Sequence, residues 1–477
     1  MTEHGRQSGA VPDHLSEEER FSNPLQRGVE KILTPFQSFI QESTTTSILL
    51  LCATVMALLV ANSAWHTEYK ELLHTQLGVL VGDRTYGTSL YHWVNDGLMA
   101  LFFFVIGLEI KRELLAGELQ NIRLAVPVVA AALGGMIMPA LIYAGFNGGT
   151  TAIYGWGIPL ATDTAFAVGV LALLGRRIPA SLAAFLTALA IIDDIGAVLV
   201  IALFYSDHLS SFFLLLMLLS LALLVLFNLM GIRHALPYLF GGLLVWWAAY
   251  ESGLHATVAG ILVALTVPAR PRRGPFWFLG RTRRLVDRFE ELEQSKVQHG
   301  RGKDSILATE DQHAIVERVQ QVAHETATPL QLWERTMEWP VSLLVLPVFA
   351  LVNAAVPVTV DALPTLLADP ITLGIVLGLL IGKVTGITGM CWLTLKCGFG
   401  ELPAKMHMHH VIGIGLLGGM GFTMSIFIAG LSFEQVPEHL LTAKSAILLA
   451  SLLAGIAGYL WLRITASQDH VPCTGSG

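Results

Sequence analysis

Two neighbouring carboxylates, Asp193 and Asp194, lie near the middle of the apolar run SLAAFLTALAIIDDIGAVLVIALF (181–204). An ionisable side chain at the centre of a membrane span costs about 2.5 to 3.5 kcal/mol even on insertion scales, so the pair needs an explanation. Adjacent carboxylates at low dielectric constant raise each other's proton affinity and titrate as one unit. We expect the pair to hold either protons or a hard cation, and competition for the same oxygens would couple the two. The alternative is a purely structural pair that partner helices neutralise.

Four more ionisable side chains lie within or at the ends of apolar segments: Asp96, Glu109, Asp163 and Lys383. Glycines surround Lys383 in GLLIGKVTGITG and leave room for its long side chain. A salt bridge from Lys383 to an aspartate of segment 180–204 is expected, and the alternative is that its ammonium reaches the membrane surface.

Two apolar segments carry helix-breaking residues near their centres. These are Pro159, Thr162, Asp163 and Thr164 in the first, and Gly418, Gly419, Gly421, Thr423 and Ser425 in the second. Proline removes a backbone donor, and hydroxyl groups offer the backbone other partners. Interrupted helices in two halves of a chain are typical of a transporter site at the membrane midplane, where Asp163 would compensate positive helix ends and Lys383 negative ones. The alternative is that the glycines only allow close packing.

The composition places these residues in a membrane. The 477 residues are 53% hydrophobic and 14% charged, with a mean hydropathy of +0.62, which excludes a soluble globular protein. The net charge of −7 argues against a nucleic-acid partner. The four cysteines show neither metal nor redox spacing: Cys52, Cys391, Cys397 and Cys473.

Twelve stretches are long and apolar enough to cross a bilayer, which needs about 20 residues. They are 46–64, 89–110, 124–145, 157–174, 180–204, 211–230, 236–250, 253–268, 339–357, 371–395, 404–430 and 437–463. The sequence therefore predicts an all-α membrane protein with twelve transmembrane helices. The short seventh and eighth stretches leave eleven as the alternative.

The distribution of positive charge tests that number. With a cytoplasmic N-terminus, 25 of the 29 lysines and arginines fall on the cytoplasmic side, 12 of them between 270 and 335. Merging two spans would move that basic loop outside. Twelve helices with both termini cytoplasmic is therefore the better prediction.

The predicted organisation has five parts: a polar cytoplasmic tail (1–44), helices one to eight (45–268), a long cytoplasmic loop (269–338), helices nine to twelve (339–465) and a C-terminal tail (466–477). The N-terminal tail lacks the early apolar region of a cleavable signal peptide. Two surface helices are predicted in the loop, at RRLVDRFEELEQ and HAIVERVQQVAH. A solvated linker is favoured there over a regulatory module.

A set of motifs, in order along the chain, resembles the NhaA-type sodium/proton antiporters. They are FFFVIGLEIKREL, ATDTAFA, ALAIIDDIGAV, SGLHATVAGILVAL, LPVFALVNA, GLLIGKVTGI and GMGFTMSIFIA, over about 45–268 and 330–465. The resemblance implies two inverted three-helix repeats, spans three to five and ten to twelve, with interrupted helices four and eleven. It also implies a bacterial inner membrane and electrogenic export of one Na⁺ or Li⁺ for two entering H⁺, switched on at alkaline pH, without a cofactor.

The resemblance assigns roles to individual residues. Asp193 and Asp194 are the cation and proton site, as ligands of the transported Na⁺ or Li⁺, with Thr162, Asp163, Lys383 and Asp96 lining it. The implied pH-regulatory residues are Glu109, Arg112, His255 and Glu334, and the implied helix breaks are Gly418, Gly419 and Gly421. A homodimer through residues 65–88 in the lipid bilayer is also implied.

The chain departs from the family pattern before the ninth span, in QLWERTMEWP. The family tends to have basic and histidine residues there, and Gln331, Arg335 and Glu338 do not carry the types expected at their positions; residues 269–330 do not align. These differences concern pH regulation and leave the aspartate pair untouched.

Other functions fit fewer features. A passive cation channel would not need a protonatable pair at a closed crossing, and a non-transporting sensor would use the basic loop. A membrane enzyme is disfavoured because no span presents a nucleophile with its base. The histidines at 407, 409 and 410 form only a weakly specified metal site.

Overall fold

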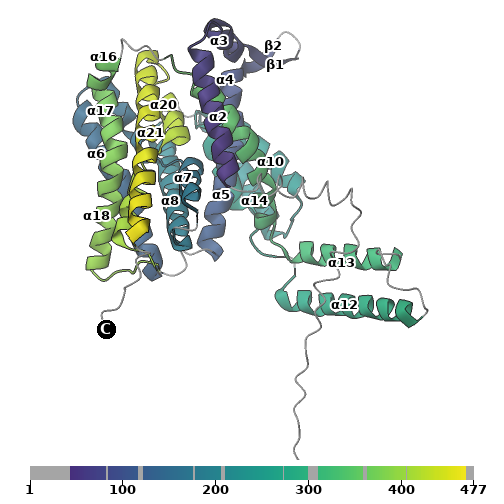
Figure 1. Cartoon of the computed structure of the whole chain (residues 1–477). Helices are drawn as coiled ribbons and strands as arrows, with labels where there is room; N and C mark the ends of the chain where they lie inside the picture. Colours follow the sequence, from purple (N-terminus) through teal and green to yellow (C-terminus); the bar gives the residue numbers. More distant parts are fainter. Residues whose placement is uncertain are drawn as a thin grey trace, which may run out of the picture.

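The computed structural model describes residues 43–81, 84–116, 122–175, 178–205, 210–271, 273–298, 310–357, 363–403 and 405–468. The described chain is mostly helical, and its long helices stand side by side in one bundle (Figure 1). The tails predicted for 1–44 and 466–477 lie almost entirely outside the described residues.

The first part of the bundle is built mainly from apolar helices. They are α2 (Ser43–Ala61), α4 (Leu90–His92), the π-helical turn η3 (Trp93–Leu98), α5 (Met99–Ala116), α6 (Ile122–Asn147), the 3₁₀-helix η5 (Thr151–Leu160), α7 (Thr164–Leu174), α8 (Ala180–Phe204), α9 (Ser211–Leu229), α10 (Ala235–Ser252) and α11 (Ala256–Thr266).

The second part continues the same pattern after the long loop. It consists of α14 (Pro329–Pro340), the π-helical turn η7 (Val341–Val345), α15 (Leu346–Asn353), α16 (Leu363–Ala368), α17 (Pro370–Leu377), the π-helical turn η9 (Gly378–Gly382), α18 (Lys383–Lys396), α19 (Met408–Leu417), α20 (Phe422–Ser432) and α21 (Pro437–Gln468).

Seven continuous helical segments of the described chain are long and apolar enough to cross a membrane. Counting each of three bent helix pairs as one span raises the number to ten. The stretches expected as spans seven and eight form α10, of 18 residues, and α11, of only 11. The class of all-helical membrane protein is thus supported, and the number twelve stays a prediction.

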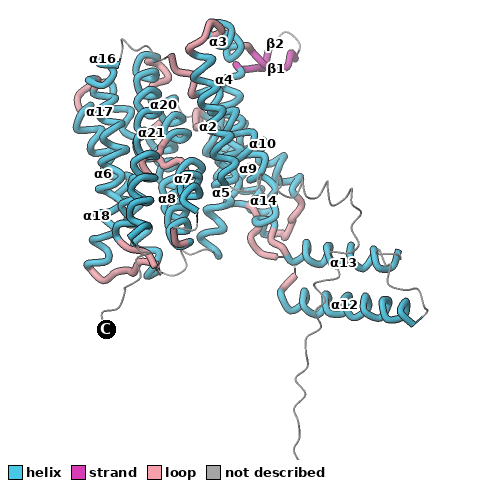
Figure 2. Tube along the Cα trace, viewed as in Figure 1, coloured by secondary structure: helices cyan, strands magenta, loops and turns pink. Residues whose placement is uncertain are grey.

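One small sheet departs from the expected all-α architecture. After α3 (His66–His74), strands β1 (Gln76–Val81) and β2 (Arg84–Ser89) pair antiparallel, with Gly78 opposite Gly87 (Figure 2). Trp93 ties the hairpin to the bundle because its Nε1 donates to the Leu77 carbonyl over 3.1 Å. Residues 76–89 are too few and too polar to be recognised as a membrane span, so hydropathy alone predicts a loop there.

The two surface helices predicted in the long loop are confirmed. They are α12 (Pro275–Gln298) and α13 (Glu310–Thr326), which pack on each other beside the bundle through Leu285, Ile315 and Val322 (Figure 1). The ninth span, however, belongs to a helical segment that starts at Pro329, well before the expected residue 339. Thr328 caps that helix by accepting from the Gln331 N–H at 3.2 Å. The helix begins with mixed polar and apolar residues, which a hydropathy criterion rejects.

Helices α6 and α18 approach each other closely at two glycines. A Cβ at Gly134 would collide with the Gly386 carbonyl oxygen, and a Cβ at Gly386 would collide with the Gly134 carbonyl oxygen. Only glycine lets two backbones approach in this way. This contact holds α18, which carries Lys383, against α6.

Candidate ion-binding site

Two non-helical stretches meet inside the bundle. Residues 161–163 separate η5 from α7, and residues 418–421 separate α19 from α20. The helices on either side of each stretch are inclined by 40° and 48°. The stretches touch directly, because the Asp163 N–H donates to the Met420 carbonyl over 2.6 Å.

Asp163 lies at the N-termini of both helices that leave this crossing. Its Oδ1 accepts from the Phe166 N–H at 3.2 Å. Its Oδ2 accepts from the Thr423 N–H at 3.0 Å and from the Thr423 hydroxyl at 2.7 Å. A carboxylate is stabilised there because a helix N-terminus carries unsatisfied N–H groups and a partial positive charge.

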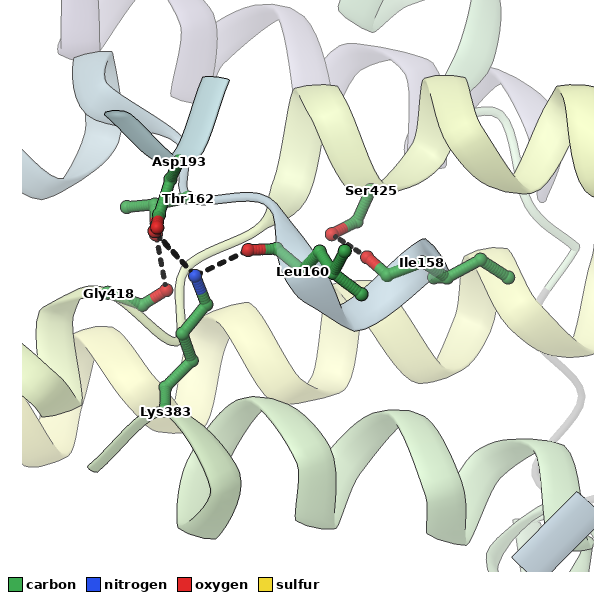
Figure 3. A network of polar contacts seen from close by, with 7 residues as sticks. All are labelled: Ile158, Leu160, Thr162, Asp193, Lys383, Gly418 and Ser425. Carbon is green, nitrogen blue, oxygen red and sulfur yellow. Dashed lines mark hydrogen bonds and ion pairs between the residues drawn. The ribbon is translucent and has the colours of Figure 1, made fainter. Parts of the chain in front are cut away.

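Lys383 lies on the opposite side of the crossing and is fully buried. Its Nζ donates to Asp193 Oδ2 at 2.6 Å, to the Leu160 carbonyl at 2.5 Å and to Thr162 Oγ1 at 3.0 Å (Figure 3). The ammonium therefore neutralises one aspartate and satisfies the carbonyl at the C-terminal end of η5.

Thr162 joins the two non-helical stretches. Its hydroxyl lies 2.8 Å from Asp193 Oδ2 and 3.0 Å from the Gly418 carbonyl (Figure 3). The hydroxyl carries one hydrogen and donates it to one of these acceptors at a time. Ser425 makes a second link, because its hydroxyl donates to the Ile158 carbonyl over 2.7 Å.

The aspartate pair keeps two oxygens without a hydrogen-bond partner in the described chain. These are Oδ1 of Asp193 and Oδ1 of Asp194, and both are buried. Buried carboxylate oxygens are otherwise paired or bound to cations, because leaving them bare costs free energy. The arrangement can therefore take up a proton or a small hard cation with oxygen ligands.

The charges of the site are unequal. Lys383 compensates Asp193, and the N–H groups of two helix ends compensate Asp163. Within the described residues, the buried Oδ1 of Asp194 has neither kind of partner. That oxygen is therefore free to accept a proton or to bind a small hard cation.

The predicted pH-regulatory residues do not form one group. Arg112 and Glu334 meet, with Nε and Oε1 2.8 Å apart, and Glu109 lies one helical turn away on α5. His255 precedes the first residue of α11, where its Nε2 lies 2.5 Å from the Tyr205 carbonyl. The opposite end of α11 is the one beside Arg112, because Lys111 donates to the Leu265 and Val267 carbonyls.

Asp96 lies apart from the crossing, in the π-helical turn η3. The Trp246 Nε1 donates to its backbone carbonyl over 3.1 Å, and Trp246 stacks on Trp93. These contacts place Asp96 beside α10, so its predicted place in the lining of the aspartate site stays a prediction.

Sequence reasoning missed a second buried lysine. This residue, Lys444 of α21, is 9% exposed, and its Nζ lies 5.9 Å from the Tyr91 ring centroid. The available signal was its position inside a predicted span. The role of Thr423 was also unassigned, and it depended on the fold.

The rings of His407, His409 and His410 lie against one another, with centroids 4.1 to 5.9 Å apart, stacked between His407 and His410 and tilted in the other two pairs. His410 Nδ1 accepts from the His407 N–H at 3.1 Å. In the described part of the chain, no group of three or more histidine, cysteine, aspartate or glutamate residues could hold a metal ion.

A bundle of apolar helices that encloses three aspartates and a lysine where two non-helical stretches meet defines a multi-pass membrane protein with a buried charged site. The sequence profile of the family described as "Na+/H+ antiporter 1" matches residues 37–462. The chain therefore belongs to this family, which confirms the resemblance to NhaA-type antiporters.

Individual relatives agree over nearly the whole chain. An Na(+)/H(+) antiporter NhaA of Sulfurimonas denitrificans is 46% identical over 447 residues, which are 94% of this chain and 99% of the relative. An Na(+)/H(+) antiporter NhaA 1 of Saccharophagus degradans is 47% identical over 443 residues, 92% of this chain and 94% of the relative.

Proposed function

We propose that this protein exchanges Na⁺ for H⁺ across a bacterial membrane and that both ions bind at Asp193 and Asp194. Family membership supports the antiport, and the two bare buried oxygens, Oδ1 of Asp193 and Oδ1 of Asp194, carry the assignment of the site. Li⁺ is a second substrate because it is also a small hard cation. As a transporter, the protein catalyses no covalent chemistry.

Coupling follows from competition. A proton on Asp194 removes the charge that a cation needs, and a bound Na⁺ keeps the proton off. Because carboxylates must be deprotonated to bind a cation, each binding event releases protons. Two protons for one Na⁺ move one net charge per cycle, so the exchange is electrogenic.

Lys383 gives the site a second state. Its ammonium pairs with Asp193 Oδ2. A cation that binds oxygens of both aspartates competes with Lys383 for Asp193. Lys383 then either separates from Asp193 or loses its proton. The ion pair therefore links occupancy of the site to the packing of α18.

The proposed architecture has twelve spans, with spans three to five and ten to twelve as inverted repeats. The reciprocal contact of Gly134 and Gly386 supports it, because α6 and α18 belong to the first spans of the two repeats and meet at equivalent surfaces. Interrupted helices four and eleven are then η5 with α7 and α19 with α20. The distribution of positive residues supports cytoplasmic termini and an inner-membrane location.

Regulation and assembly are proposed at the surface of the bundle. The Arg112–Glu334 pair, beside Glu109, sets the activating pH. The β1–β2 hairpin (Gln76–Ser89), which overlaps residues 65–88, joins two copies by pairing of exposed strand edges. Removing residues 76–89 should then give a monomer by light scattering, and an unchanged mass would refute the hairpin interface.

The experiment is a flux assay in sealed vesicles with an imposed pH gradient and a pH-sensitive dye. Na⁺ or Li⁺ should collapse the gradient for the wild type and K⁺ should not, while Asp194→Asn should give no response. Asp369→Asn is the control, because it also neutralises one carboxylate, here at the start of α17 and away from the aspartate pair, while asparagine keeps the cap on that helix. A response to Na⁺ that grows with membrane potential would establish electrogenic exchange.

Other outcomes would point elsewhere. A cation flux that does not depend on the pH gradient would favour a passive channel. Folded protein that shows no flux would favour a sensor. Normal exchange by Asp194→Asn would refute the proposed site.

A further inference from the structure

An apolar groove of about 1060 Å³ opens between α2, α7 and α21. Helices α2 and α21 stand on the near face of the bundle in Figure 1. Their groove-lining residues include Leu51 and Leu452, which are 53% and 62% exposed. In a membrane these residues face lipid, so the groove is open to the bilayer from the side.

The walls of the groove suit hydrocarbon. The Ser47 hydroxyl donates to the Ala165 carbonyl, the Thr54 hydroxyl to the Leu50 carbonyl and the Ser445 hydroxyl to the Leu441 carbonyl. These three donors are therefore used within the protein, whereas the buried hydroxyl of Ser451, which also lines the groove, has no partner within the described residues. The remaining lining is dominated by leucine, isoleucine, valine and phenylalanine.

The length of the groove is close to the thickness of the bilayer core. Its lining on α21 extends from Leu441 to Leu460, which at 1.5 Å of rise per residue is about 28 Å, close to the hydrocarbon thickness of about 30 Å. An occupant of this site must be long, flexible and apolar, as acyl chains are.

The two ends of the groove carry opposite charges. Asp369 lines one end, and its Oδ1 accepts from the Ile371 N–H at 2.8 Å. At the other end, the lining face of α21 continues from Tyr459 to the exposed Arg463, four residues on and hence on the same side of the helix. A phosphate is repelled at the Asp369 end and attracted at the Arg463 end, because guanidinium binds phosphate with charge-assisted hydrogen bonds.

From this geometry we infer that the groove binds a phospholipid, with its acyl chains between α2 and α21 and its phosphate on Arg463. The leaflet is the cytoplasmic one in the proposed orientation of the chain. Only this leaflet assignment rests on the proposed function, and the binding itself does not.

The bound lipid lies against the ion-binding crossing. Phe166 and Phe422 line the floor of the groove, with ring centroids 5.2 Å apart. Phe166 also donates its N–H to Asp163, the carboxylate that caps α7 and α20. Acyl chains in the groove therefore pack on residues that hold the crossing together and keep water away from it.

The test uses the full chain, delipidated in dodecyl maltoside and titrated with palmitoyl-oleoyl-phosphatidylglycerol, with native mass spectrometry to count bound lipids. The wild type should retain lipid at the groove, and Arg463→Gln should weaken that binding at least tenfold. Lys396→Gln is the control, since it removes an exposed charge at the end of α18. Equal binding by Arg463→Gln and Lys396→Gln would overturn the assignment of the phosphate.

A second pair of variants tests the acyl chains. Val55→Trp with Leu452→Trp fills the groove and should abolish the binding. Leu215→Trp with Leu219→Trp places the same volume on exposed positions of α9, outside the groove, and should leave it intact. If both double variants elute from size-exclusion chromatography as folded protein and retain equal amounts of lipid, the groove is not the lipid site. Asp194→Asn should bind lipid normally, so loss of transport and loss of lipid are distinguishable.

Discussion

Asp163 and Thr423 lie 260 positions apart in the sequence, yet one oxygen of the Asp163 carboxylate accepts both the backbone N–H and the hydroxyl of Thr423. The other oxygen accepts the N–H of Phe166 at the start of α7. One side chain thus caps two helices that come from different halves of the chain.

Replacing this double cap should destabilise the fold. Asp163→Ala is expected to lower the free energy of unfolding by about 1 to 2 kcal/mol for each of the two helix ends. Asp369→Ala removes the cap of α17 alone and should cost about half as much. Denaturant unfolding in detergent measures both, and equal losses would mean that the second cap contributes nothing.

The buried ion pair should show strong coupling. Lys383→Met leaves the Asp193 charge without compensation and should cost about 3 to 5 kcal/mol. Adding Asp193→Asn removes that charge, so the double variant should regain much of the loss. A double-mutant cycle of melting curves measures this coupling. Additive losses would show that the pair does not act as a unit in the folded state.

The affinity for Na⁺ should depend on pH because protons and Na⁺ compete for the same oxygens. At low pH the aspartates hold protons, so the Na⁺ concentration for half-maximal response should rise as the pH falls, by about tenfold per pH unit for each proton released. Dye-based flux measured at several pH values tests this slope. A half-maximal concentration that does not move with pH would exclude competition at a shared site.

The Arg112–Glu334 pair should affect regulation more than stability. Both side chains are partly exposed, at 35% and 13%, so the pair stabilises the fold by less than about 1 kcal/mol. Glu334→Gln should shift the pH profile of transport while leaving its maximal rate near that of the wild type. The charge swap Arg112→Glu with Glu334→Arg should move the profile back. If Glu334→Gln leaves the profile in place, the pair has no regulatory role.

Much of the fold is local information in the sequence. The long apolar runs, the two helix breaks and the surface helices α12 and α13 could be predicted because hydropathy, proline, glycine and residue periodicity act within a few residues. The cost of burying charge is equally local, and from the sequence alone it singles out a set of candidates: Asp96, Glu109, Asp163, Asp193, Asp194 and Lys383. The start of α14 at Pro329 was missed because that helix is not apolar enough for a search by hydropathy.

The tertiary structure decided which of these residues meet. Asp193 and Asp194 are equal by composition and position in the sequence, yet only Asp193 receives Lys383. Helix packing also decided that Arg112 pairs with Glu334, whereas His255 lies at the far end of α11. The groove that ends near Arg463 needs three helices from three parts of the chain. A sequence determines which charged groups need a partner in a membrane, because the free-energy cost of burying a charge without a partner depends on the group itself. Which partner relieves the cost depends on helix packing, where contacts between distant segments set the distances and directions.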